Sequence, residues 1–211
     1  MKRLYSLLYA LSIVLINPWG NSRGAIWTQP KVFVVCLIVL LNFIVLLEAQ
    51  IDRDRENLPI PKSWYLCLLL WGLFLGIGLL STLRSPAPML SLLGQGEMGD
   101  GWLYWLLIAS FSLTNLLLLR LHPELLYSQV RGLISGGFIQ ALSIFPQVWD
   151  WRIDYTVKMG QLAQDNMLAS AILQNQQPIG LYSHRGHGAL VLAATGTLIL
   201  IAWRQGWLSL K

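Results

Sequence analysis

Residues 32–47 read VFVVCLIVLLNFIVLL, an apolar run in which Asn42 is the only amide and no residue is charged. A second run, WYLCLLLWGLFLGIGLL at residues 64–80, also carries no charge. A helix needs roughly 17–25 mostly apolar residues to cross a bilayer core. In lipid the backbone amides must be satisfied inside the protein, and the chain lacks the regular alternation that is typical of barrel strands. These two runs therefore predict membrane-spanning helices.

The composition of the whole chain agrees with these runs. Hydrophobic residues make up 55% and charged residues 12% of the 211 residues, and the mean hydropathy is +0.55. Soluble domains are only about 45–50% apolar and about 25% charged. We predict an all-α fold, a polytopic integral membrane helical bundle in one transmembrane domain over residues 1–211. About six transmembrane helices are expected, near residues 4–16, 32–47, 64–80, 102–119, 132–148 and 188–203.

The ends of these runs and the basic residues predict the topology. Lys2 and Arg3 precede a short apolar run that also fits a signal peptide, but no cleavage site of the A-x-A kind follows, so we expect an uncleaved first helix. With a cytoplasmic N-terminus, nine of the 15 Lys and Arg residues lie inside, as the positive-inside rule favours. Tryptophans such as Trp19 and Trp27 lie near the run ends, where headgroup anchors are common.

This topology has consequences for localisation and partners. It predicts an integral membrane protein whose long polar loop, residues 149–187, faces the periplasm or an equivalent external compartment. The net charge of +5 then reflects topology, and no nucleic acid is expected as a partner. Membrane lipid is the partner that this topology predicts.

The polar stretch PIGLYSHRGHG at residues 178–188 lies directly before the last apolar run. The planar fork of an arginine suits phosphate or pyrophosphate, and histidines can donate hydrogen bonds or move a proton near neutral pH. The start of a helix also favours anions. His184, Arg185 and His187 are therefore a candidate site for the anionic head of a lipid-linked sugar. The alternative is a polar collar whose charged ends reach the headgroup phosphates.

Other chemistries lack the residues they need. Two histidines with no nearby cysteine supply too few ligands for zinc, so no metal is expected. Cys36 and Cys67 lie inside apolar runs, where a thiol packs as a small hydrophobe. The glycines at residues 94–101 match no phosphate-loop spacing, so neither a nucleotide nor another cofactor is expected.

The layout of short helices, the stretch DYTVKMG at residues 154–160 and above all QPIGLYSHRGHG at residues 177–188 resemble the N-terminal half of cyanobacterial members of the O-antigen ligase and polymerase family. The resemblance implies metal-independent transfer of a glycan from a polyprenyl-diphosphate carrier at the outer leaflet. Arginines would hold the diphosphate and a histidine would act as base. Members of that family are much longer, and their functional arginine and histidine come in the second half. We therefore expect a truncated or reduced glycosyltransferase-like protein, and no catalytic residue is assigned.

Two functions follow from these observations. In the first, the protein handles a polyprenyl-diphosphate-linked glycan, and a second membrane subunit supplies the missing half. Its substrate-binding residues would be Arg84, Arg152, His184, Arg185 and His187. In the alternative, the protein is a non-catalytic multi-span membrane subunit or a bicarbonate-transport-related component whose polar loop docks a partner.

Overall fold

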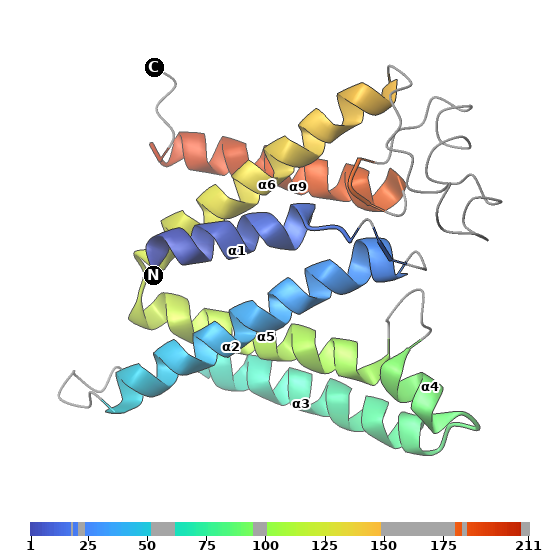
Figure 1. The fold of residues 1–211 in the computed structure, drawn as a ribbon. Helices are drawn as coiled ribbons and strands as arrows, with labels where there is room; N and C mark the ends of the chain where they lie inside the picture. Colours follow the sequence, from blue (N-terminus) through green and yellow to red (C-terminus); the bar gives the residue numbers. More distant parts are fainter. Residues whose placement is uncertain are drawn as a thin grey trace. The chain divides into compact units, whose positions relative to one another are not determined.

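A computed structural model of the protein describes residues 1–17, 19–20, 24–51, 62–94, 101–148, 180–182 and 185–207. In these ranges every regular element is a helix and no strand occurs, which confirms the predicted all-α class (Figure 1). In chain order the elements are α1 (Lys2–Val14), the π-helix η1 (Gly24–Thr28), α2 (Gln29–Ile51), α3 (Lys62–Leu83), α4 (Pro88–Leu93), α5 (Trp102–Leu121), α6 (Leu125–Val148) and α9 (Arg185–Arg204).

Four stretches of these helices are long and apolar enough to cross a membrane: Gly24–Ala49, Lys62–Leu83, Trp102–Leu121 and Gly186–Arg204. The protein is therefore an integral membrane protein. The predicted runs at residues 4–16 and 132–148 also form helices, α1 and α6, but they do not meet the same criteria. With 13 residues, α1 is only about 20 Å long. Among the described residues, four helices, rather than the predicted six, are both long enough and apolar enough to span a membrane.

The helices extend beyond the apolar runs that predicted them. α2 begins at Gln29, where Pro30 in the first turn suits a helix start, and ends at Ile51. α9 begins at Arg185, three residues before the predicted start at residue 188. The short helices η1 and α4 were not predicted, because hydropathy detects only segments of membrane length.

The chain divides into two compact units. The first contains Met1–Val34 and Leu125–Lys211, and the second contains Val35–Glu124. α2 thus begins in the first unit and continues in the second. The single domain over residues 1–211 stays a prediction.

In the first unit, α6 packs against both α1 and α9 (Figure 1). Gly132 and Gly136, four residues apart on α6, face α1, and a Cβ at Gly136 would lie 2.8 Å from the backbone oxygen of Ala10. A Cβ at Gly132 would likewise collide with the backbone oxygen of Ser6. Small residues at this spacing let two helix backbones approach closely in a membrane.

These contacts also give the helix directions. The pairs Gly132 with Ser6 and Gly136 with Ala10 show that α1 and α6 run in the same direction. The Tyr127 ring near the start of α6 packs edge-on against Trp207, just after α9, with ring centroids 6.3 Å apart. α9 therefore runs opposite to α6, so four exposed cations gather at one end of the first unit. We call this the basic end: Lys2, Arg3, Arg131 and Arg204.

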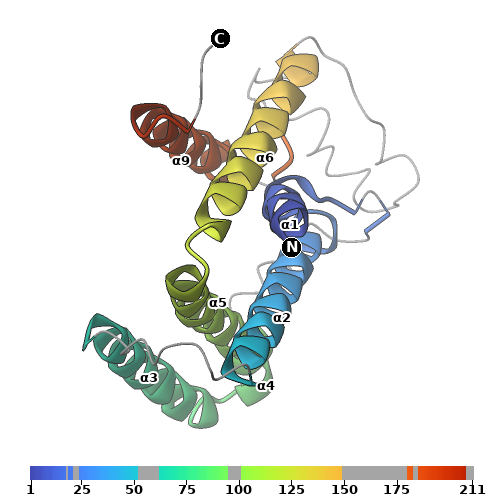
Figure 2. The ribbon, with the colours of Figure 1, turned by 90° about the vertical axis from the view of Figure 1, so that its left-hand side faces the viewer.

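In the second unit, α5 packs against α3 and α4 (Figure 2). The Trp102 indole N–H donates to the backbone oxygen of Leu75 at 2.8 Å. Asn42, on the second-unit part of α2, is fully buried and donates from Nδ2 to Oγ1 of Thr114 on α5 at 3.3 Å. The amide in the run at 32–47 therefore has a hydrogen-bond partner on another helix of the second unit.

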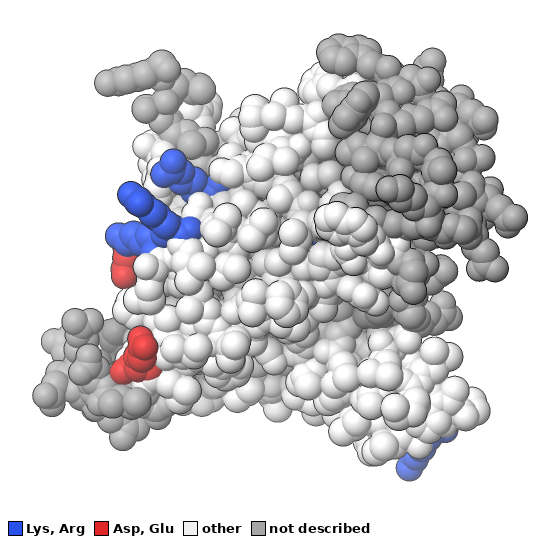
Figure 3. Space-filling view, viewed as in Figure 1, with Lys and Arg blue, Asp and Glu red and all other residues white. Residues whose placement is uncertain are grey.

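The helix surfaces are mostly uncharged and apolar. Only 6% of the apolar window of α3 is buried, and Leu69, Leu73 and Leu80 are more than half exposed. Charged side chains are sparse on the described face seen in Figure 3. A helix that is hydrophobic all round suits a lipid environment, so this exposure is consistent with an integral membrane protein.

Candidate functional site

Residues 180–182, which lead into α9, are held through the backbone of Leu181. Its N–H donates to Oε1 of Gln140 on α6 at 2.8 Å, and Gln140 is fully buried. Its C=O accepts from Nζ of Lys31, in the first turn of α2, at 2.9 Å. Side chains from two other helices of the first unit therefore bind both backbone groups of Leu181. These two contacts fix Leu181, four residues before the first residue of α9.

Lys31 directs all of its hydrogen-bond donors at backbone oxygens. Besides Leu181, its Nζ donates to the C=O of Leu15, just after α1, at 3.1 Å, and to the C=O of Trp27 in η1 at 3.0 Å. An ammonium group has three donors and no acceptor, so its hydrogen-bonding capacity is filled. Lys31 thus joins the end of α1, η1, its own helix and the segment before α9.

The two neighbours of Leu181 complete this arrangement. Nζ of Lys31 lies 4.6 Å from the centre of the Tyr182 ring, within the range of a cation–π interaction. Burial raises the pKa of the Tyr182 phenol to about 12, so the ring is neutral at physiological pH. Gly180 has a φ of 63°, which glycine adopts readily, and a Cβ there would collide with the side-chain amide of Gln140.

Two of the predicted site residues begin the helix that follows. Arg185 and His187 lie in the first turn of α9, and His187 is exposed. His184 and Arg152, also in the predicted set, lie outside the described residues. The structure therefore places Arg185 and His187 in one helical turn, two residues apart, a spacing at which side chains do not face each other on the helix surface. This turn begins three residues after Tyr182.

This turn has the electrostatics of an anion site. The N–H groups at the start of a helix lack intrahelical acceptors and carry partial positive charge. The first turn of α9 contains no acidic residue that would neutralise this charge. Arg185 adds a full positive charge, and His187 adds a donor or a second charge when it is protonated.

Sequence reasoning missed the residues that hold this turn in place. In the sequence, Lys31 is one of 15 Lys and Arg residues and Gln140 is an amide in the apolar run at 132–148, and neither pattern names a partner. The start of α2 places Lys31 in the first unit, where the acceptors from Leu15 and Leu181 lie 16 and 150 residues away in sequence. One weak signal was present, because a lysine directly before a long apolar run must find partners or reach the headgroups.

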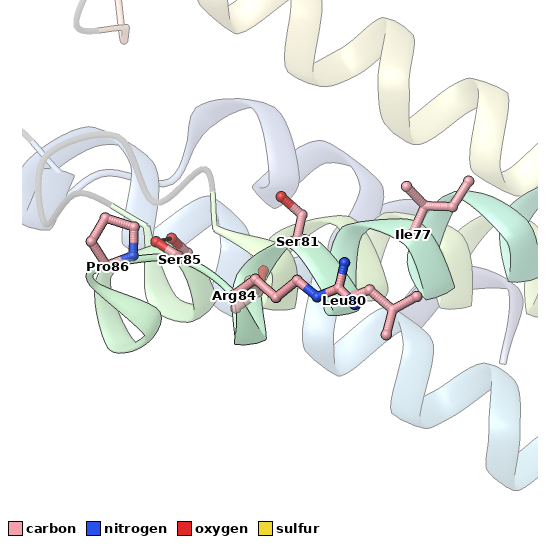
Figure 4. A pocket seen from close by; sticks show the side chains of 8 residues that line it. Ile77, Leu80, Ser81, Arg84, Ser85 and Pro86 are labelled. Atoms are coloured by element: carbon pink, nitrogen blue, oxygen red, sulfur yellow. Dashed lines mark hydrogen bonds between the residues drawn. The ribbon is translucent and has the colours of Figure 1, made fainter.

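Arg84 belongs to the second unit and is therefore described apart from these residues. It follows α3, is exposed, and its guanidinium makes no hydrogen bond or ion pair with the described part of the chain. Arg84 borders an open pocket of about 670 Å³ (Figure 4). The other residues lining the pocket are Ile77, Leu80, Ser81, Thr82, Ser85, Pro86 and Ser91.

The described residues contain no group of three or more His, Cys, Asp and Glu side chains that could hold a metal ion. Comparison with known protein families, curated proteins and solved structures finds no match to this chain. A functional assignment therefore rests on the residues and contacts described above.

Proposed function

We propose that this protein binds the diphosphate headgroup of a polyprenyl-linked glycan at the external face of a bacterial inner membrane. The resemblance to the N-terminal half of an O-antigen ligase or polymerase implies a ligand of this class. The observation that carries the proposal is the double anchoring of Leu181 by Gln140 and Lys31. It gives the helical turn with Arg185 and His187 a defined start.

The length of α9 supports a headgroup-level location. Its 20 residues correspond to about 30 Å, close to the thickness of a hydrocarbon core. If α9 crosses the bilayer, its first turn lies where the diphosphate of a membrane-anchored carrier would lie. The polyprenyl chain would extend into the lipid beside the apolar part of the helix.

The residue types suit a diphosphate ligand. Arginine can bind two phosphate oxygens at once through its planar fork, and the N–H groups of the first helical turn add further donors. His187, with His184 and Arg152 from the predicted set, would add donors around the same group. The proposed function is binding of the lipid-linked glycan, and no catalytic step is assigned.

Six spans fit this proposal better than four. Gln129 and Gln140 lower the hydropathy of α6, but they are only 3% and 0% exposed, so the bundle shields them from lipid. α1 and α6 run in the same direction and α9 runs opposite, as the predicted alternation of six spans requires. With α1 and α6 included, the basic end would be cytoplasmic and Arg185 external, in line with the positive-inside rule.

A binding assay with two arginines of one helix tests the proposal. Polyprenyl diphosphate is titrated into the protein in nanodiscs of zwitterionic lipid. Arg185→Ala should raise the Kd about tenfold or more, because it removes a charge-assisted contact. Arg204→Ala is the matched control, because it removes an arginine from the last turn of α9, about 28 Å away.

The outcomes separate this function from its alternatives. Equal weakening by Arg185→Ala and Arg204→Ala would indicate general attraction to charge and contradict a site at Arg185. If the wild-type protein does not bind polyprenyl diphosphate, the proposal fails. Co-purification would then test the alternative of a non-catalytic membrane subunit, such as a bicarbonate-transport-related component.

A further inference from the structure

We propose that the pocket beside Arg84 binds the phosphate group of a bilayer phospholipid, with the acyl chains lying along the end of α3. The pocket lies wholly in the second unit and does not depend on the proposed polyprenyl-diphosphate site. The inference combines four properties of the pocket: its place at the end of an apolar span, its exposed cation, its hydroxyl groups and its apolar wall.

The location of the pocket is that of a lipid headgroup. Arg84 is the first residue after the apolar span Lys62–Leu83, so its backbone lies at the boundary of the hydrocarbon core if this span crosses the bilayer. Figure 4 shows its side chain extending along the surface of α3 toward Leu80. The volume of about 670 Å³ is within the range of pockets that hold small ligands.

The described lining of the pocket is positively charged and includes no acidic residue that would compensate Arg84. Arg84 is exposed, and its guanidinium contacts no acidic residue of the described part of the chain. None of the residues that line the pocket is Asp or Glu. A guanidinium offers five N–H donors, which match the oxygens of a phosphate group.

The hydroxyl groups are arranged to donate as well. Oγ of Ser85 accepts hydrogen bonds from Oγ of Ser91 at 2.8 Å and from the backbone N–H of Ala87 at 3.2 Å. Because its oxygen is used twice as an acceptor, the O–H of Ser85 remains available as a donor. Ser81 lines the same pocket one turn before Ser85 and adds a second hydroxyl.

The apolar wall distinguishes a lipid from a free anion. Ile77 and Leu80 line the pocket on the side of the apolar span and are 68% and 59% exposed. Inorganic phosphate would gain nothing from these side chains. A phospholipid places its phosphate against Arg84 and its acyl chains against the two apolar residues, so both parts of the pocket are used.

Native mass spectrometry of the delipidated full-length protein tests this site. The occupancy of the first bound phosphatidylglycerol is measured for the wild type, Arg84→Ala, Arg84→Lys and Lys62→Ala. We expect Arg84→Ala to weaken binding about tenfold. Arg84→Lys should bind between the two, because lysine keeps the charge but loses the fork. Lys62→Ala, which removes an exposed cation from the other end of α3, should bind as the wild type does.

Two further ligands identify the source of the phosphate. Diacylglycerol with the same acyl chains should bind equally to the wild type and to Arg84→Ala, because it has no phosphate. Millimolar inorganic phosphate should not displace the phospholipid. The proposal is overturned if Arg84→Ala binds phosphatidylglycerol as the wild type does, or if Lys62→Ala weakens binding as much. Competition by inorganic phosphate would overturn it too, since the pocket would then be a site for a free anion.

Discussion

At the scale of single residues, Lys31 holds more of the first unit together than its sequence position suggests. Its ammonium donates to the backbone oxygens of Leu15, Trp27 and Leu181. Each oxygen belongs to a different turn or helix. An acceptor left unsatisfied inside a protein costs about 1–3 kcal/mol. The contribution of Lys31 is therefore an effect on stability as well as on the shape of the site.

We predict that Lys31→Met lowers the free energy of unfolding by roughly 3 kcal/mol. Methionine keeps most of the side-chain volume but donates no hydrogen bond. The measurement is thermal unfolding of the purified protein in detergent. Lys62→Met is the control, because Lys62 is exposed and makes no side-chain contact in the described part of the chain. Equal melting temperatures for the two variants would show that the Lys31 contacts do not stabilise the fold.

Gly180 offers a second test at this scale. We predict that Gly180→Ala destabilises the protein by about 2–4 kcal/mol, because alanine disfavours a positive φ and its Cβ would collide with Gln140. Gly206→Ala separates the two causes, since Gly206 has a φ of 69° but no heavy atom within 4 Å of the added Cβ. Thermal unfolding should place Gly206→Ala within about 1–2 kcal/mol of the wild type. Similar losses of unfolding free energy for both variants would show that the collision with Gln140 contributes nothing.

Some of these residue roles could be predicted from the sequence and others could not. Asn42 and Gln140 lie in apolar runs, where an amide must find a partner inside the protein, and both are fully buried. Trp27 was predicted to be a headgroup anchor, but it is 5% exposed and packed within the first unit. An indole near a run end has the same sequence pattern in both environments. Tertiary contacts with distant segments decide between them.

At the scale of helices, the contact between α1 and α6 depends on two glycines. Gly132 and Gly136 let the backbone of α6 approach Ser6 and Ala10, and a side chain at either position would push the helices apart. The sequence predicted both helices, but it did not predict this pairing. A spacing of four residues between glycines does not identify the partner helix.

We predict that Gly136→Val lowers the free energy of unfolding by about 1–3 kcal/mol, because the added methyl groups cannot fit against α1. Gly196→Val on α9 is the matched control, since a Cβ at Gly196 meets no heavy atom within 4 Å. Both substitutions add the same β-branched side chain to a helix interior, so the difference between them isolates the packing. Chemical unfolding in detergent measures it. Equal losses would mean that helix propensity alone explains the effect.

The ends of the helices were less predictable than their centres. Apolar runs located the central parts of α2, α3, α5 and α9, because hydrophobicity over a membrane length is a strong signal. The start of α9 at Arg185 was missed, since a helix can continue into the headgroup region with polar residues. That difference moves Arg185 and His187 from a loop onto a helix. It also gives the candidate site its ordered backbone.

At the scale of the whole molecule, the membrane assignment follows from hydropathy, but the number of spans does not. A helix packed between neighbours can carry amides that lipid never contacts, as Gln129 and Gln140 do in α6. The hydropathy of such a helix falls although its lipid-facing surface stays apolar. Whether α1 and α6 cross the bilayer therefore depends on their packing, which composition cannot reveal. The directions of α1, α6 and α9 within the first unit say more about the number of spans than hydropathy does.

Cysteine labelling of the two ends of α9 tests the proposed topology. In a protein with Cys36→Ser and Cys67→Ser, a membrane-impermeant maleimide should label His187→Cys in intact spheroplasts. It should label Gln205→Cys only after permeabilisation, because Gln205 lies just after α9, next to Arg204 of the basic end. Both positions are exposed in the structure, so a difference in labelling reports the side of the membrane. The reverse pattern would place the basic end outside, against the positive-inside rule. Labelling of both positions from outside would mean that α9 does not cross the membrane, and the location proposed for Arg185 at the external headgroups would be wrong.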